Sequence, residues 1–111
     1  MSLLAIDMGT SSCKAVLFSE DGRVLSHKSC NYAASKSPHP TWAEMAAENF
    51  WDALSKVCQQ VSAESGDTVS ALAISSHGET FVPVNECGEA VGPSILNYDN
   101  RATAESGPAA A

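Results

Sequence analysis

The stretch Ala5-Ile6-Asp7-Met8-Gly9-Thr10-Ser11-Ser12-Cys13-Lys14 lies between two apolar runs, residues 3–6 and 15–18, which predict two β-strands. Between them the chain turns through small residues, with one carboxylate before the turn and one lysine after it. Glycine accepts positive φ and lets a backbone approach a ligand, and successive N–H groups in such a turn can form a concave anion site. The pattern therefore fits either an ordinary hairpin with a polar turn or a phosphate site.

The two charges beside this turn indicate what kind of phosphate it would suit. Lys14 attracts a phosphate, whereas Asp7 repels a bare polyphosphate. A divalent cation removes the conflict, because Mg²⁺ is usually bound by one or two carboxylates, waters and substrate phosphates. The turn lacks the second glycine before Lys-Ser/Thr that a P-loop requires. We therefore favour a site for a metal-bound nucleotide and keep the polar hairpin turn as the alternative.

The composition limits the class of protein. A chain of 111 residues with 44% hydrophobic residues can form one modest domain with a real core. Its net charge of −7 argues against nucleic acid or an anionic membrane surface as partner, because both attract a basic face. A nucleotide needs only local donors and stays compatible with an acidic chain.

Targeting segments and disulfides are not expected. An apolar run of only four residues precedes Asp7, without the basic leader of a signal peptide, and no run approaches the length of a membrane span. The four cysteines are widely spaced and form no C-x-x-C pair. We expect four free thiols in a reducing cytoplasm. They are Cys13, Cys30, Cys58 and Cys87.

The first half of the chain predicts three strands and a helix. Strands over residues 3–7, 13–18 and 23–30 are joined by the polar turn and by an Asp-Gly turn at residues 20–22, so they should be antiparallel. Thr41 and Glu44 have capping-box spacing and predict the helix start, and Gly66 predicts its end. Apolar residues three or four apart predict its buried stripe, which Trp51 widens. The stripe comprises Ala47, Phe50, Leu54, Val57 or Cys58, and Val61.

The second half predicts one buried strand and a looser region. Residues 69–75 read as a strand with both faces buried, followed by the polar loop Ser76-His77-Gly78-Glu79-Thr80. Residues 81–84 and 90–96 predict a strand pair around a turn at 85–88. Residues 103–111 form a small-residue tail that we expect to be frayed.

The order of these elements predicts where the two polar loops lie. A helix that joins two strands of one sheet normally makes them parallel, with a right-handed connection. The carboxyl ends of the first strand and of residues 69–75 then meet at one edge, where open α/β sheets bind ligands. We therefore predict an α/β fold, with three antiparallel strands, a helix and a parallel strand, and both polar loops at a common cleft.

With both loops assigned, the chain resembles the amino-terminal part of an FGGY-family carbohydrate kinase, of the actin and sugar-kinase ATPase superfamily. Four segments carry the resemblance in the family's order: DMGTSSCK (7–14), TWAE (41–44) with Trp51, AISSHGET (73–80) and ILNYDNRA (95–102). The resemblance implies a ribonuclease H-like mixed sheet, here an incomplete first lobe over residues 1–102. It also implies a cytoplasmic transferase that uses ATP and Mg²⁺ to phosphorylate a sugar or polyol, with a xylulose-like ketose favoured.

The resemblance also implies roles for single residues. Asp7 would position Mg²⁺, and the phosphates would meet the turn. His77 would be a hydrogen-bond partner of the sugar, with a general base for the sugar hydroxyl or a structural histidine as the alternatives. The next three residues of its loop would join it at the sugar. For Asp99 and Arg101 a sugar contact and a structural ion pair both stay open. The phosphate residues are Gly9, Thr10, Ser11, Ser12 and Lys14, and the loop residues after His77 are Gly78, Glu79 and Thr80.

The chain also departs from the family pattern. It ends before the family's second phosphate motif, its adenosine motif and its catalytic aspartate, so the 111 residues alone are expected to be inactive. In that case missing strands should leave an exposed sheet edge and an apolar patch. The alternative is a stand-alone module that binds a nucleotide or a partner without catalysis. A homodimer is left open.

Overall fold

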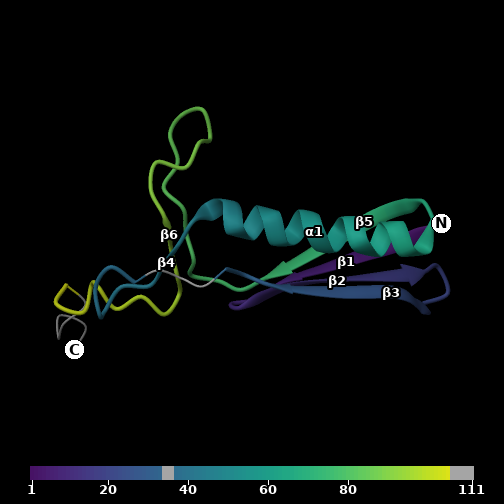
Figure 1. Cartoon of the computed structure of the whole chain (residues 1–111), viewed down its shortest axis with the longest axis horizontal. Helices are drawn as coiled ribbons and strands as arrows, with labels where there is room; N and C mark the ends of the chain where they lie inside the picture. The colour runs from purple at the N-terminus through teal and green to yellow at the C-terminus, as the bar shows by residue number, and fades with distance from the viewer. Residues whose placement is uncertain (34–36, 106–111) are drawn as a thin grey trace. The chain divides into compact units, whose positions relative to one another are not determined.

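The computed structural model describes residues 1–33 and 37–105 (Figure 1). The chain divides into two compact units. The first comprises Met1–Tyr32 and Glu48–His77, and the second comprises Ala33–Ala47 and Gly78–Ala111.

The first unit is built on a mixed four-stranded sheet in the order β3-β2-β1-β5. Strands β1 (Ser2–Met8), β2 (Ser12–Ser19) and β3 (Val24–Asn31) are consecutive and antiparallel. Strand β5 (Val69–Ser76) returns beside β1 and runs parallel to it, with Met8 opposite Ser76. The predicted α/β class, with three antiparallel strands, a helix and a parallel strand, is confirmed.

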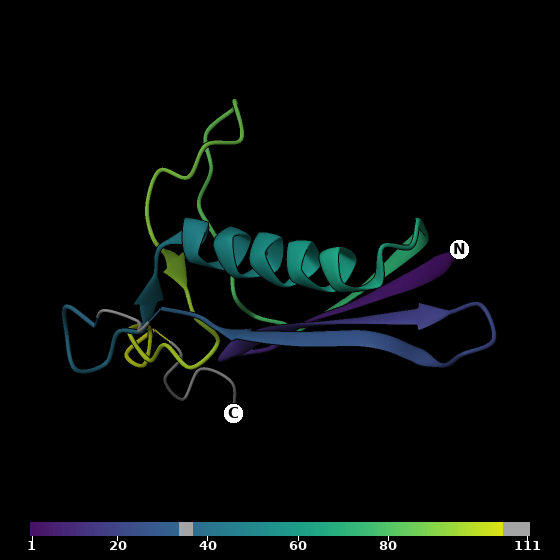
Figure 2. The ribbon, with the colours of Figure 1, turned by 45° about the vertical axis from the view of Figure 1, so that its right-hand side comes forward.

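Helix α1 (Ala47–Ser65) covers one face of this sheet (Figure 2). Alternate residues of β1 and β2 are buried, as the period-two pattern of a half-covered strand requires. The helix buries a stripe with a spacing of four residues, so the core consists of small and branched side chains from both layers. It includes Leu4, Ile6, Ala15, Leu17, Ala53, Val57 and Val61.

The helix ends as predicted but begins later. Gly66 has φ +61° and its N–H donates to the Ser62 carbonyl at 3.2 Å, which is a glycine C-terminal cap. The capping box at Thr41 and Glu44 is wrong, because the Glu44 carboxylate accepts from Arg101 instead. Trp51 does not widen the buried stripe either. It is 67% exposed, since it lies two residues, about 200°, from Ala53 around the helix.

Strand β5 contradicts the prediction that both of its faces are buried. Leu72 is 61% exposed and Ile74 is 56% exposed, and the remaining residues of the strand are exposed or half-buried. Within residues 1–33 and 37–105, β5 pairs only with β1, so it is an edge strand. The expected exposed edge and apolar patch are therefore both present on this unit.

The second unit contains a small antiparallel pair of β4 (Glu44–Met45) and β6 (Ser94–Ile95). The strand pair expected from residues 81–84 and 90–96 is reduced to two isolated bridges, Phe81 with Ile95 and Val84 with Ala90. Two prolines, Pro83 and Pro93, interrupt this region and remove ladder donors, which accounts for the irregular pairing. The tail that we predict covers residues 103–111, of which 106–111 lie outside the described residues.

The thiols and the helix answer two further expectations. All four cysteines are free, and burial raises the pKa of the Cys13 and Cys58 thiols, which keeps them protonated and unreactive. No helix in the described part of the chain has the length and hydropathy needed to cross a bilayer.

Candidate functional site

Strands β1 and β2 are joined by a tight hairpin turn at residues 9–12, of which Ser12 is the first residue of β2. Met8 pairs with Cys13, and the Gly9 N–H donates to the Ser12 carbonyl at 3.0 Å. A Cβ atom on Gly9 would lie 3.2 Å from that carbonyl oxygen, a tight contact, so the close approach favours glycine. The hairpin interpretation of the backbone is thus correct. It leaves the phosphate interpretation open, because Thr10 is exposed at the tip of the loop.

Asp7 and Lys14 are opposite each other on β1 and β2, separated from the turn by the pair Met8 and Cys13. Their side chains are 53% and 58% exposed, and the Lys14 Nζ atom lies 4.0 Å from Asp7 Oδ2. An exposed ion pair at this distance contributes about 0–1 kcal/mol. Both charges are therefore available to other ligands at little energetic cost.

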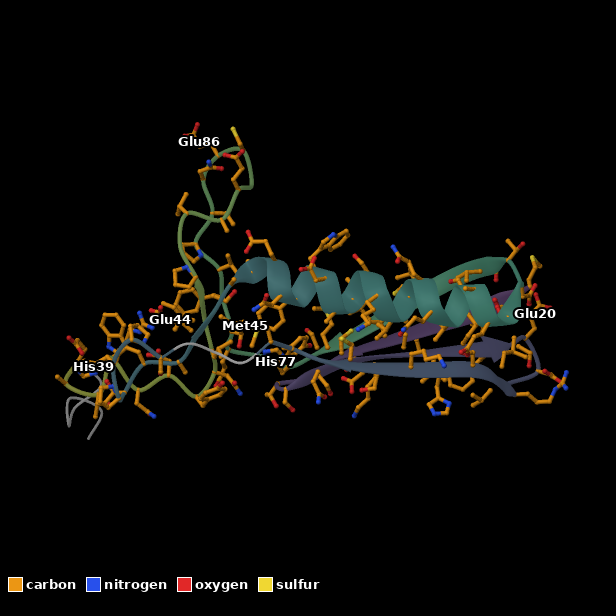
Figure 3. All side chains as sticks on the ribbon, viewed as in Figure 1. Glu20, His39, Glu44, Met45, His77 and Glu86 are labelled. Atoms are coloured by element: carbon orange, nitrogen blue, oxygen red, sulfur yellow. The ribbon has the colours of Figure 1, made fainter. Side chains whose placement is uncertain are left out.

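His77 follows β5 and reaches back to the end of β1, and Figure 3 labels it there. Its backbone N–H and its ring Nδ1 both bond to the Met8 carbonyl, at 3.0 and 2.9 Å. The ring contacts Phe50 of α1, with centroids 6.2 Å apart, and Phe50 contacts Tyr32 edge-on at 4.8 Å. The prediction that the Asp7 turn and the His77 end of β5 lie at one edge of the sheet is confirmed within the first unit.

The three residues that follow His77 in its loop belong to the second unit. Glu79 is exposed and has φ +66°, a left-handed conformation that residues other than glycine adopt at a cost. Thr80 Oγ1 accepts a hydrogen bond from the Asn97 N–H at 3.2 Å. Gly78 is exposed between His77 and Glu79.

Asp99 and Arg101 form a compact ion pair in the second unit. Arg101 donates from Nε to Asp99 Oδ1 at 2.8 Å and from Nη2 to Asp99 Oδ2 at 2.7 Å. The same carboxylate accepts the Ala43 N–H at 2.6 Å and the Arg101 N–H at 2.9 Å. Its side chain is only 5% exposed, and the hydrogen bonds from Arg101 hold the pKa of Asp99 far below its usual range.

The pair extends to two residues that the sequence did not connect with it. Arg101 Nη2 also donates to Glu44 Oε1 at 2.8 Å, and its guanidinium lies 4.3 Å from the ring centroid of Trp42. We call these five residues the arginine cluster: Trp42, Ala43, Glu44, Asp99 and Arg101. Opposite charges on Glu44 and Arg101 were visible in the sequence, but a separation of 57 residues gave no reason to pair them.

Tyr32 is a second residue that the sequence did not single out. It is buried, and its hydroxyl has no hydrogen-bond partner among the described residues. Burial, with Cys13, Asp7 and Cys30 nearby, raises the pKa of Tyr32 to about 12. The buried Tyr32 hydroxyl therefore stays protonated at neutral pH.

The predicted site residues thus fall into two groups. The first unit brings together Asp7, the loop residues Gly9, Thr10, Ser11 and Ser12, Lys14 and His77. The second unit contains Gly78, Glu79, Thr80 and Asp99. Among residues 1–33 and 37–105, no group of three or more His, Cys, Asp or Glu side chains gathers as a metal site. A metal bound at Asp7 would therefore need its other ligands from waters or a bound substrate.

Comparison with known proteins connects both units to one family. Residues 2–107 match the FGGY family of carbohydrate kinases, N-terminal domain. The chain is 32% identical over 105 residues to a glycerol kinase from Acinetobacter baylyi, covering 90% of this chain and 21% of that protein. It is 31% identical over 105 residues to a xylulose kinase from Escherichia coli, covering 92% and 21%.

A solved structure gives the same result for the fold. The crystal structure of xylulose kinase from Rhodospirillum rubrum matches with a TM-score of 0.86 and 25% identity, over 95% of this chain and 22% of that one. The chain thus spans about a fifth of the length of the relatives that it matches. Since the match covers nearly all of its residues, the chain belongs to the FGGY family of carbohydrate kinases, to the N-terminal domain of that family.

Proposed function

We propose that this chain is the amino-terminal part of an ATP-dependent kinase that phosphorylates a hydroxyl of a sugar or polyol, with a xylulose-like ketose favoured. The observation that carries the proposal is the parallel pairing of β1 with β5. It brings the Asp7 hairpin and His77 to the same end of the sheet, where both strands finish. Membership of a carbohydrate kinase family supplies the reaction class.

The hairpin supplies the nucleotide side of the proposed site. Lys14 and the hydroxyls of the loop would meet the phosphates of ATP, and Asp7 would hold Mg²⁺ directly or through water. The loose 4.0 Å pair of Asp7 and Lys14 fits this use, because each charge can exchange its partner for the oppositely charged part of a metal-nucleotide complex. When bound, the cation would neutralise charge that develops on the transferred phosphoryl group.

The loop that begins at His77 supplies the proposed sugar side. Glu79 would accept hydrogen bonds from sugar hydroxyls, with His77, Gly78 and Thr80 beside it. The left-handed backbone at Glu79 supports this role, because strained residues of this kind cluster at ligand sites. The relatives include a glycerol kinase and a xylulose kinase, so the proposed substrate class comprises both polyols and ketoses.

For Asp99 the described geometry supports the structural alternative over a sugar contact. Both carboxylate oxygens already accept hydrogen bonds from Arg101 and from the Ala43 backbone. A sugar hydroxyl could bind there only by displacing a charge-assisted bond. We assign Asp99 to holding Arg101, and through it the segment around Glu44.

The remaining parts of the proposal concern the whole protein. Phosphoryl transfer depends on groups positioned around the transferred phosphate. The chain covers only about a fifth of its relatives, so residues 1–111 alone should have no appreciable kinase activity. We place the protein in the cytoplasm, where ATP and Mg²⁺ would be available. We do not propose nucleic acid or membrane as partners.

The proposal is tested by a phosphorylation screen of the kinase polypeptide that carries this chain. Pentuloses, hexuloses, aldonates and polyols are offered with Mg²⁺–ATP, and ADP release is measured. Turnover is expected with a pentulose or a related polyol and not with residues 1–111 alone. A folded polypeptide that turns over none of these substrates, or a 111-residue chain that is active alone, would contradict the proposal.

A further inference from the structure

The peptide group between Met8 and Gly9 is held on both sides. Its carbonyl accepts two hydrogen bonds from His77, one from the backbone N–H at 3.0 Å and one from ring Nδ1 at 2.9 Å. Its N–H donates to the Ser12 carbonyl at 3.0 Å. A carbonyl oxygen has two lone pairs, so every hydrogen-bonding position of this peptide is used.

The histidine ring that makes one of these bonds is itself fixed. A carbonyl can only accept, so Nδ1 must carry the proton, and in the neutral ring Nε2 is then the acceptor. The ring also contacts Phe50 of α1, with centroids 6.2 Å apart. Phe50 in turn packs edge-on against Tyr32. Rotation of the ring away from Met8 would therefore disturb the aromatic contacts as well as the hydrogen bond.

From this geometry we infer that His77 is a positioning residue for the nucleotide turn. Through the Met8 carbonyl it sets the orientation of the peptide that opens the loop at residues 9–12. It thereby connects the start of the proposed sugar loop, residues 77–80, with the proposed phosphate loop, residues 9–12. The hydrogen bonds between His77 and the Met8 carbonyl, which we call the clasp, do not depend on the proposed function. The coupling to nucleotide rests on that function.

The coupling has a consequence for binding. Any ligand that fixes the His77 ring also favours the conformation of the Met8–Gly9 peptide that the clasp holds. By linkage, a nucleotide that prefers this conformation then strengthens binding at the His77 side by the same factor. Sugar and nucleotide should accordingly bind with positive cooperativity, which is lost when the clasp is lost.

Two variants of His77 separate the clasp from other roles of the ring. In His77→Asn the amide nitrogen occupies the δ position and can still donate to the Met8 carbonyl. In His77→Gln the amide lies one bond further out, near the position of Nε2, and the donor to Met8 is lost. His27→Gln, on the exposed side of β3, is the matched control for replacing a histidine.

The first measurement is hydrogen exchange of the Gly9 amide by NMR in the 111-residue chain. The wild type, His77→Asn and His27→Gln should protect this amide alike, and His77→Gln should exchange it roughly tenfold faster. Equal protection in His77→Asn and His77→Gln overturns the inference. If a variant unfolds, the tautomer of His77 in the wild type decides, since a ring protonated on Nε2 rather than Nδ1 also overturns it.

The second measurement separates the inference from the proposed function. In the kinase polypeptide, His77→Gln should raise the KM for Mg²⁺–ATP roughly tenfold and abolish the cooperativity. His77→Asn, which keeps the donor to Met8 but loses the ring proposed to meet the sugar, should leave the KM for Mg²⁺–ATP within about twofold of wild type and weaken sugar binding. ATP parameters unchanged in both variants overturn the positioning role while the kinase function stands. If the Gly9 amide is protected as expected but the kinase polypeptide binds no nucleotide, the proposed function is refuted and the clasp remains supported.

Discussion

Two of the carboxylate–cation pairs in the described part of the chain, Asp7 with Lys14 and Asp99 with Arg101, differ in exposure and in hydrogen bonding. Asp7 and Lys14 are half-exposed, lie 4.0 Å apart and hold each other weakly. Asp99 and Arg101 are joined by two short side-chain bonds, and the carboxylate is 5% exposed. The first pair can exchange its partners for a ligand, whereas the second has already used its hydrogen-bonding capacity within the protein.

The difference shows which charged residues to assign to ligands. A charge whose partners are complete stabilises a segment, and its removal strands the other charge. A charge left loosely paired at the carboxyl end of a strand contributes little to stability and can serve binding. The comparison therefore separates loss of function from loss of stability between the two regions.

The largest effect is expected from Asp7→Asn. In the kinase polypeptide it should lower kcat by roughly 10²- to 10⁴-fold, because the cation would lose its carboxylate, with modest change in the KM for sugar. The free energy of unfolding should change by less than about 0.5 kcal/mol, since the Lys14 pair is exposed. Kinetics and urea unfolding check the two halves, with Asp52→Asn on α1 as control. Unchanged turnover would remove the metal role.

The opposite outcome is expected from Asp99→Asn. Arg101 would lose its carboxylate partner, so the melting temperature should fall by roughly 5–10 °C, as differential scanning calorimetry would measure. Asp21→Asn is a matched control, because Asp21 and Arg23 form a pair with the same sequence spacing on the exposed surface. Equal losses in the two variants would mean that the arginine cluster stabilises no more than a surface pair.

Acid should destabilise the arginine cluster selectively. Hydrogen bonds from Arg101 lower the pKa of Asp99 in the folded protein, so its stabilising effect is complete above the unfolded value near 4. It is lost as the pH falls below that value toward the folded one. Unfolding measured from pH 6 to pH 2 should show a steeper loss in the wild type than in Asp99→Asn. Parallel curves would contradict the role of Asp99.

Glu79→Gly tests whether strain and binding coincide. Glycine accepts φ +66°, so the free energy of unfolding should rise by about 0.5–1 kcal/mol. Loss of the carboxylate should raise the KM for sugar roughly tenfold if it accepts a charge-assisted bond from a hydroxyl. Glu79→Gln, which keeps the backbone strain and removes only the charge, separates the two effects. A more stable variant with an unaltered KM would take Glu79 out of the site.

Sequence reasoning was most successful where local patterns and topology agreed. The alternation in β1 and β2 and the crossover through α1 were sufficient to predict the parallel β5 and the meeting of Asp7 with His77 at one edge. The phosphate role was predicted from the small residues and charges of the turn, and the sugar role came from the resemblance. Both stay predictions. The capping box failed, because Thr41 and Glu44 have the right spacing while the carboxylate has a stronger partner in Arg101.

Long-range contacts explain the remaining differences. Nothing local shows that Glu44 pairs with a residue 57 positions later, or that Tyr32 is buried with its hydroxyl unsatisfied among the described residues. The exposed faces of β5 could not be predicted from its composition either. An apolar strand reads as buried whether or not a neighbour lies beside it.

The smallest effect, at the opposite end of the pH scale, concerns the first unit. Tyr32→Phe removes a buried hydroxyl that has no partner among residues 1–33 and 37–105, and should raise the free energy of unfolding by roughly 0.5–1 kcal/mol at neutral pH. The folded pKa of about 12 lies above the unfolded value near 10, so the wild type should lose stability as the pH rises from 10 to 12. The variant should lose less over that interval, by urea unfolding at fixed pH. Because Asp99 responds only to acid, a double variant with Asp99→Asn should show the two pH effects independently. If alkaline sensitivity persisted unchanged in Tyr32→Phe, it would have to come from another group.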